Sequence, residues 1–241
     1  MSKILKFLNV GGENYNIGYS SNDYTTSDKS NLERLIDKNF PLRVTLTTNT
    51  TSSASNALNA NSPVKATIYW TLRYEGNSSN EDASKYFGIL KVGNTSINLE
   101  GEQLGKGSYE YNAFLSKTTT ITLTVNDKVG STTIYIEKPM YSGCRTLEQG
   151  PPSRLTDLTR IEPIATTIAN MSNQNVTGLS TKYVYWIAIP DTLSITGAKD
   201  VNTGFGFPLE LDSSVSIAGY KVYKSGGLAA NTNWTIKISD N

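Results

Sequence analysis

The stretch Val64-Lys-Ala-Thr-Ile-Tyr-Trp-Thr-Leu-Arg73 carries an apolar side chain at every second position, and this pattern decides the fold class. Its apolar members alternate with Lys, Thr, Tyr and Arg. A period of two places successive side chains on opposite faces of a strand, so the stretch predicts a half-buried β-strand. Similar alternation or strand-forming composition recurs at residues 43–48, 87–92, 109–114, 121–125 and 134–136.

These strands lie within residues 40–141, with Gly and Asn between them and no helical period. About six or seven short strands in a stretch of this length are typical of an antiparallel β-sandwich. We therefore expect an all-β protein in which residues 40–141 form a first Ig-like sandwich. Within it, residues 49–61 are rich in Ser, Thr and Asn and predict a long exposed loop.

Residues 156–241 repeat this plan on a smaller scale. The run from Tyr183 to Ile189 is apolar on both faces, as in a central strand, and Pro190 ends it. A closing strand is expected at residues 234–238. We therefore predict a second, smaller Ig-like sandwich in series with the first.

Residues 142–155 separate the two predicted sandwiches. They contain Gly143, Gly150 and the pair Pro151-Pro152, and they show no apolar period. Pro-rich segments are semi-rigid spacers, so this segment is expected to be a linker.

Residues 1–39 form a separate element. Strand patterns on both sides of Gly11-Gly12 predict a β-hairpin, and Ser30-Asn-Leu-Glu33 is a capping box that begins a short helix before Pro41. A hairpin and two helical turns cannot bury all their apolar side chains between them, so we expect a docking element for a neighbouring subunit. The alternative is that it packs on the first sandwich. The predicted docking residues are Ile4, Phe7, Leu8, Leu32, Leu35 and Ile36.

The residue types exclude most enzyme classes. The chain has no His, so it lacks the imidazole that Ser-His-Asp and Cys-His triads and His-ligated metal sites need. Its one cysteine, Cys144, has no second cysteine with which to form an internal disulfide. We predict no catalytic residues, no metal and no cofactor. The remaining enzyme alternative is a glycosidase that uses two carboxylates. The spacing of the Asp and Glu residues does not indicate such an acid/base pair.

Charge and hydropathy limit the classes of partner that the sequence predicts. Lys and Arg number 22 and Asp and Glu number 21, a balance that argues against nucleic acid as a partner. No stretch approaches the roughly 20 apolar residues of a membrane helix. The start, Met1 to Val10, has too short an apolar run to predict a signal peptide.

Aromatic side chains are the remaining candidates for binding. Those inside strands, including Trp70 and Trp186, are predicted to be core anchors. The loop Gly204-Phe-Gly-Phe-Pro208 carries two further aromatics, and loops more often carry function. Phe205 and Phe207 are therefore predicted to form a surface contact loop.

Four stretches of strand sequence resemble a known group of proteins. They are Lys117–Asp127, Ile134–Tyr141, Lys182–Pro190 and Tyr220–Ser225, and they are similar to strands in tail and fibre proteins of crAss-like phages, which infect Bacteroidetes. This resemblance implies a structural protein of the virion, assembled in the host cytoplasm, with Ig-like domains in several copies of a symmetric assembly. Its implied partners are portal or neck, tail or fibre subunits and a glycan of the host surface. The resemblance brings no catalytic residues.

The alternative function is that of a carbohydrate-binding module on a bacterial cell surface. That function needs a secretion signal, which the start of this sequence does not predict.

Overall fold

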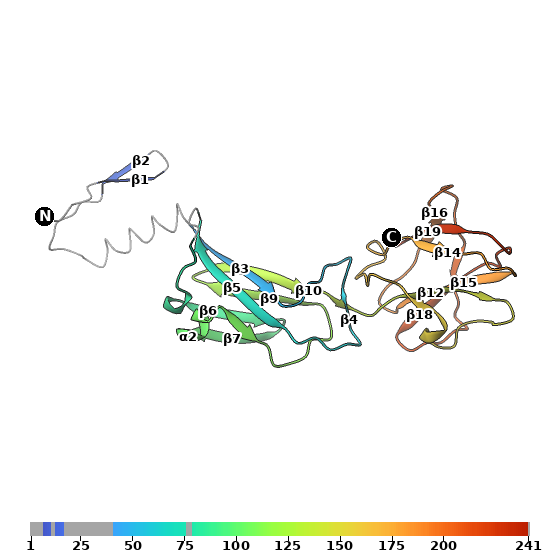
Figure 1. The fold of residues 1–241 in the computed structure, drawn as a ribbon, viewed down its shortest axis with the longest axis horizontal. Helices are drawn as coiled ribbons and strands as arrows, with labels where there is room; N and C mark the ends of the chain where they lie inside the picture. The colour runs from blue at the N-terminus through green and yellow to red at the C-terminus, as the bar shows by residue number, and fades with distance from the viewer. Residues whose placement is uncertain (1–6, 11–12, 17–40, 76–78, 241) are drawn as a thin grey trace.

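The computed structural model describes residues 7–10, 13–16, 41–75 and 79–240. The described chain is all-β and consists of several mostly antiparallel sheets. Its buried apolar side chains form three clusters: one defines a first sheet region, residues 41–137, and the other two lie in a second sheet region, residues 138–240. Figure 1 shows these regions following one another along the long axis of the molecule.

The first sheet region has two antiparallel sheets that share one core. One sheet has the order β3-β5-β8 and the other β10-β9-β6-β7. As the alternation predicts, Ile68, Trp70 and Leu72 of β5 point into this core, where they join Leu90 and Leu123 of the other sheet. The elements are β3 (Leu42–Thr48), β5 (Thr67–Tyr74), η1 (Ala83–Lys85), β6 (Phe87–Val92), β7 (Thr95–Glu100), α2 (Glu102–Gly105), β8 (Ser108–Glu110), β9 (Thr119–Val125) and β10 (Lys128–Ile134).

The two sheets lie close together where β10 passes β3. A Cβ atom built on Gly130 would lie 2.5 Å from the carbonyl oxygen of Val44 and 2.7 Å from Leu46 Cδ1. Only glycine fits at this distance, so Gly130 allows the two sheets to lie this close together at this edge.

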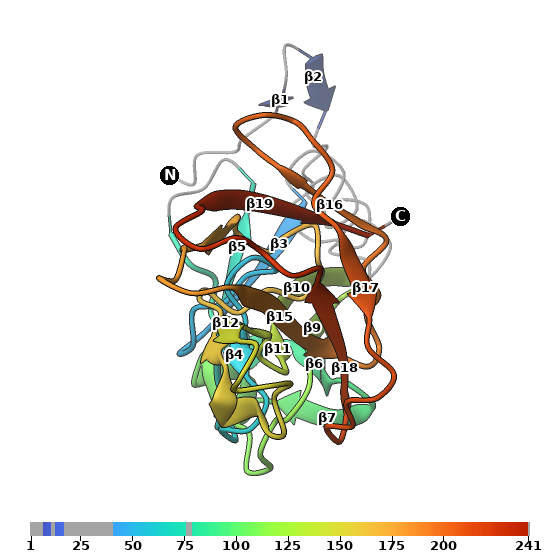
Figure 2. The same ribbon diagram turned by 90° about the vertical axis from the view of Figure 1, so that its right-hand side faces the viewer.

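The second sheet region is built around β15, which lies in the middle of a five-stranded sheet of order β13-β12-β15-β18-β17. A three-stranded sheet of order β14-β19-β16 packs on one face, as Figure 2 shows from the end of the molecule. The strands are β12 (Tyr141–Thr146), β13 (Thr159–Arg160), β14 (Gln174–Val176), β15 (Tyr183–Pro190), β16 (Gly197–Asp200), β17 (Leu209–Leu211), β18 (Tyr220–Ser225) and β19 (Trp234–Ser239).

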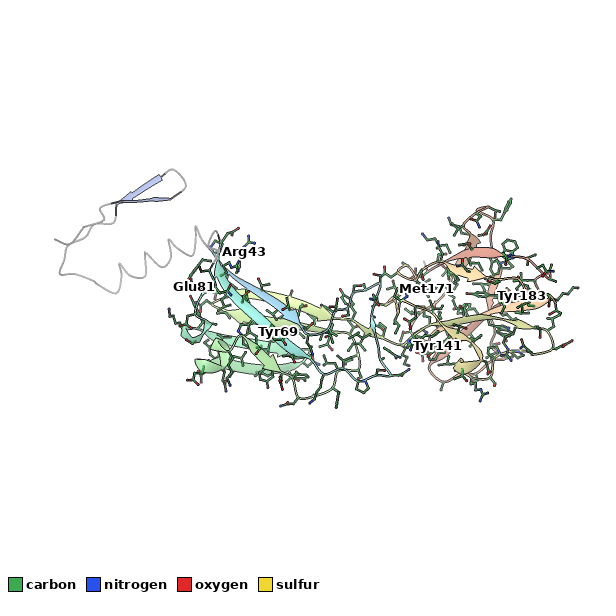
Figure 3. The ribbon with its side chains drawn as sticks, in the orientation of Figure 1. Arg43, Tyr69, Glu81, Tyr141, Met171 and Tyr183 are labelled. Carbon is green, nitrogen blue, oxygen red and sulfur yellow. The ribbon has the colours of Figure 1, made fainter. Side chains whose placement is uncertain are left out.

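The prediction that β15 is buried on both faces is confirmed. Tyr185 and Ile187 belong to the core shared with the three-stranded sheet, whereas Trp186 and Ala188 pack with Leu158 on the other face. In Figure 3, Tyr183 lies in the second sheet region, farther from the first than Tyr141 does. Trp70 and Trp186 are 4% and 5% exposed, so both are core residues as predicted.

The expectation of a linker over residues 142–155 is wrong for its first part. Residues 141–146 form β12, which pairs with β13 on one side and β15 on the other. Gly143, Cys144 and Arg145 have weak strand signals of their own, but six consecutive backbone pairs with β15 hold them extended. The chain then turns and forms the short 3₁₀ helix η2 (Leu155–Asp157).

Residues 49–61 are loop for most of their length, as their composition predicts, but part of the segment is held against other elements. Within them, β4 (Leu58–Asn59) pairs in parallel with β11 (Ile136–Glu137), and the side chain of Ala57 is buried. The backbone N–H of Ala57 donates to Ile164 O over 2.6 Å, and that of Thr166 donates to Ala54 O over 3.0 Å. We call this set of contacts the joint, because it connects the two sheet regions where β4 lies in Figure 1.

The predicted N-terminal hairpin is confirmed for the residues described. β1 (Phe7–Val10) pairs antiparallel with β2 (Glu13–Asn16), in a register that begins with Phe7 opposite Asn16. The helix predicted to begin at Ser30 lies outside the described residues.

Candidate functional site

The residues predicted to dock on a neighbouring subunit can be placed only in part. Phe7 and Leu8 lie in β1, whose partner among the described strands is β2. Ile4, Leu32, Leu35 and Ile36 lie outside the described residues. The hairpin therefore adds no strand to the described sheets of either region.

The predicted contact loop at residues 204–208 presents one aromatic side chain rather than two. Phe205 is 75% exposed, but Phe207 is 3% exposed and packs edge-on against the rings of Tyr185 and Trp234. The prediction that Phe207 is a surface contact is therefore wrong. Its backbone N–H donates to Ala198 O in β16, and this pairing turns its side chain into the core.

A buried carboxylate fixes the turn that carries Phe205. Asp200 Oδ2 accepts hydrogen bonds from the Thr203 hydroxyl over 2.7 Å and from Thr203 N–H over 3.0 Å. Asp200 Oδ1 accepts from the N–H of Thr235 over 3.3 Å. The Thr203 hydroxyl is the main cause that holds the pKa of Asp200 below its usual range. These hydrogen bonds to Asp200 therefore hold in place the turn that exposes Phe205.

A cavity that sequence reasoning did not identify lies on the second sheet region, over the face of the five-stranded sheet that carries Trp186. Its volume is about 460 Å³, and its walls come from β15, β17, β18 and the loop that follows β12. Val184, Trp186 and Pro151 supply apolar surface, while Glu210 and Lys224 supply charge. We call it the Trp186 cavity.

One wall of the Trp186 cavity holds an ion pair. Lys224 Nζ lies 3.0 Å from Asp212 Oδ2, and the other carboxylate oxygen accepts from the hydroxyl and the N–H of Ser214 over 2.6 and 3.0 Å. The Ser214 hydroxyl is the main cause that lowers the pKa of Asp212. Asp212 is thus ionised and neutralised by Lys224, whereas Glu210 beside it is an exposed carboxylate.

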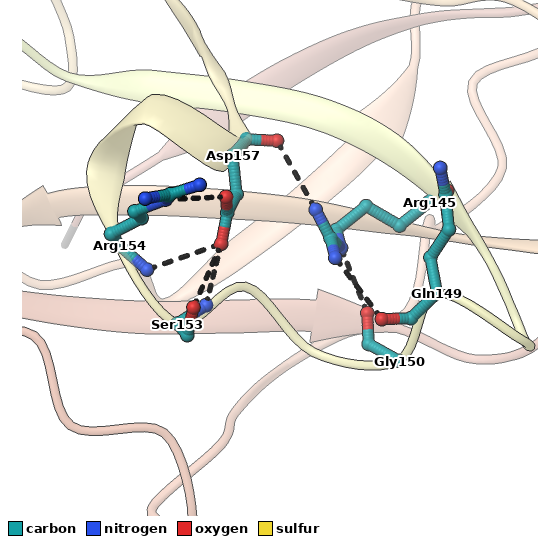
Figure 4. Close-up of polar contacts among 6 residues, drawn as sticks. All are labelled: Arg145, Gln149, Gly150, Ser153, Arg154 and Asp157. Carbon is teal, nitrogen blue, oxygen red and sulfur yellow. Dashed lines mark hydrogen bonds and ion pairs between the residues drawn. The ribbon is translucent and has the colours of Figure 1, made fainter.

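Charged side chains outside the cavity organise its rim, the loop of residues 146–157 (Figure 4). The Arg145 guanidinium donates from Nε to Gly150 O over 2.8 Å and from Nη2 to Gln149 O over 3.0 Å. Asp157 Oδ2 accepts from the N–H and hydroxyl of Ser153 and from the N–H of Arg154. These bonds, led by that from the Ser153 N–H, lower the pKa of Asp157 to about 2.

A second cavity, of about 510 Å³, lies between β12 and β14 and is lined by Cys144, Gln174 and Tyr185. The Gln174 amide is already occupied, since it accepts from the Ser142 hydroxyl and donates to Ser172 O. Burial raises the pKa of the Cys144 thiol to about 11, so this sulfur is protonated at neutral pH and is a poor nucleophile. The cavity therefore offers little chemistry.

The described residues contain no group of three or more His, Cys, Asp and Glu side chains placed to hold a metal ion. In the same part of the chain, no helix has the length and apolar character needed to cross a membrane. No family model, curated protein or solved structure matches this chain.

Proposed function

We propose that this chain is a non-enzymatic structural component of a bacteriophage virion, of the tail, neck or fibre type found in crAss-like phages. The joint is the observation that best supports this function. It connects two sheet regions that have separate cores, so that the second region follows the first along the molecule. A spacer that joins other subunits needs this arrangement, and the resemblance of the strand sequences to phage tail and fibre proteins is in accord with it.

The joint combines backbone and side-chain groups from distant parts of the chain. Besides the β4·β11 pair, the Tyr135 N–H donates to the Ser52 hydroxyl over 3.0 Å, and the Tyr220 hydroxyl donates to Pro139 O over 3.0 Å. Lys138 Nζ lies 6.0 Å from the centre of the Tyr220 ring, within the range of a cation–π contact. These contacts hold the connecting residues against their own regions, and the bonds of Ala57 with Ile164 and of Ala54 with Thr166 cross between the regions.

The two sheet regions are proposed to be Ig-like sandwiches. In the first, sheets of three and four strands enclose one core, and in the second, sheets of three and five strands enclose another. Packed antiparallel sheets of this size are typical of the Ig-like architecture. Such domains in series are effective spacers because each one folds around its own core.

Attachment to the particle is assigned to residues 1–39. A two-stranded hairpin is marginally stable alone in water, and β1 and β2 pair only with each other among the described strands. A neighbouring portal, neck, tail or fibre subunit would supply the missing cover, with the chain present in several copies. The competing arrangement has this segment packed on the first sheet region.

The test is whether the protein belongs to intact particles. Phage particles purified on a density gradient are analysed by quantitative mass spectrometry, and the protein is expected to sediment with the major capsid protein in a constant ratio. Recovery only from the soluble fraction of the lysate would contradict the proposal.

A truncated chain then tests the attachment. Residues 40–241 are expected to melt within a few degrees of the full chain and to fail to join particles that lack the protein. A large loss of stability in the truncated chain, with particle association retained by a milder Leu35→Ser variant, would show that the segment packs on its own first region.

A further inference from the structure

Two glycines at the mouth of the Trp186 cavity have no role in the fold itself. Gly226 and Gly227 line this cavity, and neither has a positive φ angle. A Cβ atom built on either residue would meet no atom within 4 Å. Neither backbone conformation nor packing therefore requires glycine here. Their effect is to leave the cavity open on this side.

The walls of the cavity combine apolar surface with groups that both donate and accept hydrogen bonds. Trp186, Val184 and Pro151 are apolar, and the rim residue Leu147 is exposed although it is a large hydrophobic residue. The indole N–H of Trp186 is buried and has no acceptor among the described residues. Glu210 supplies an exposed carboxylate, which makes short, strong hydrogen bonds to hydroxyl donors.

The charges decide which class of ligand these walls suit. Asp212 and Glu210 outnumber Lys224, so an anionic ligand would meet net repulsion. A hydrocarbon ligand would cover the Lys224–Asp212 pair without replacing the water lost from it. A neutral sugar ring satisfies both requirements, because it has an apolar C–H face and hydroxyl groups that donate to carboxylates and accept from ammonium.

We propose that the Trp186 cavity is a binding site for a neutral saccharide. Its volume of about 460 Å³ lies in the range of small-molecule sites, roughly 300–1,000 Å³. Hydrogen bonds from Arg145 and to Asp157 hold the rim in place before binding. Binding a sugar therefore costs little conformational entropy in the rim. The site lies in the second sheet region, and its function does not depend on the chain being part of a virion.

The test uses the full chain labelled with ¹⁵N and the methyl glycosides of glucose, galactose, mannose and N-acetylglucosamine. One or more of them is expected to cause saturable changes in the NMR signals of Gly226, Gly227 and the Trp186 indole, with a dissociation constant of about 1 mM. Absence of saturable changes at these residues with all four glycosides would overturn the proposal.

A plugged variant and its matched control locate the site. Gly227→Gln fills the mouth and is expected to weaken binding at least about tenfold, whereas Gly206→Gln, at a glycine with equally open surroundings outside this cavity, leaves it unchanged. Equal loss of binding in both variants, or in neither, would contradict the assignment. If Gly227→Gln does not fold, Glu210→Gln, at an exposed position, takes its place and is expected to weaken binding several-fold.

Charged probes test the ligand class. Methyl glucuronide and butylamine are titrated under the same conditions, and both are expected to bind more weakly than the best neutral glycoside. Tighter binding of methyl glucuronide would show that Lys224 dominates the site, and tighter binding of butylamine would show that Glu210 recognises a cation. Either result would replace the neutral saccharide as the ligand.

Discussion

The backbone N–H of Ala57 donates a hydrogen bond of 2.6 Å to the carbonyl oxygen of Ile164 and so connects a segment of the first sheet region with the second. The side chain of Ala57 is 4% exposed, which leaves no room at this point for a larger group or for water. Together with the bonds from Thr166 to Ala54 O, this contact couples two regions that have separate cores. Its loss should therefore uncouple them without unfolding either one.

The variant Ala57→Arg tests this coupling. A buried arginine without a partner is costly, and the joint can avoid that cost by opening. We expect calorimetric unfolding to change from one transition to two, and small-angle X-ray scattering to show a broader range of overall lengths. The exposed Ser55→Arg in the same segment is the control. A single transition and unchanged scattering in Ala57→Arg would show that the joint does not couple the regions.

Two buried tryptophans should respond differently to the same substitution. The Trp70 indole N–H donates to Leu104 O over 2.9 Å, whereas that of Trp186 has no acceptor among the described residues. Replacement by Phe removes a similar volume at both sites but loses a hydrogen bond only at Trp70. We expect Trp70→Phe to lower the free energy of unfolding by about 1 kcal/mol more than Trp186→Phe, as measured by denaturant titration. An equal or reversed order would contradict this account.

Acid should loosen the rim of the Trp186 cavity. The pKa of Asp157 is lowered to about 2 in the folded chain, chiefly by the Ser153 N–H, whereas an unfolded Asp titrates near 4. A lowered pKa stabilises the fold fully above about pH 4, and this contribution is lost as the pH falls toward 2. The melting temperature should thus fall over this range, and less steeply in Asp157→Asn than in the exposed control Asp191→Asn. Equal slopes in both variants would rule out this role for Asp157.

The contact of β10 with β3 in the first region should not tolerate a methyl group. Gly130→Ala would place Cβ 2.5 Å from Val44 O, and the sheets would have to move apart. We expect it to lower the free energy of unfolding by about 1–3 kcal/mol, as overpacked cores do. Gly206→Ala, whose Cβ would meet no atom within 4 Å, should be nearly neutral. Similar stability of the two variants would show that β3 and β10 can adjust freely.

Alternation predicted the strands whose two faces differ in environment. Residues 87–92 were expected to form a strand and do so as β6, and residues 43–48 correspond to β3. The N-terminal pattern likewise predicted the hairpin of β1 and β2. The secondary structure of each of these segments can be predicted from its own residues, either by a period of two or by a glycine turn.

Segments whose structure depends on partners distant in the sequence were not predicted correctly. Residues 142–146 and 58–59 have compositions typical of linkers and loops, and only their pairing with β15 and β11 makes them strands. Phe205 and Phe207 are two residues apart in one loop, and only the bond from Phe207 N to Ala198 O distinguishes the buried ring from the exposed one. The Trp186 cavity has four separate segments as walls, so no local pattern could reveal it.

The joint also orders events during protein synthesis. The hydroxyl of Thr166 bonds to the carbonyl oxygen of Ala54, 112 positions earlier, and the Tyr135 N–H bonds to Ser52 across 83 positions. Tyr135 belongs to the first sheet region, so on the ribosome this region can fold with Ser52 already bonded, while Ala54 and Ala57 still wait for Thr166 and Ile164. Until the nascent chain has passed Thr166, these two residues lack their partners in the second region, and the backbone around them is open to a protease or chaperone.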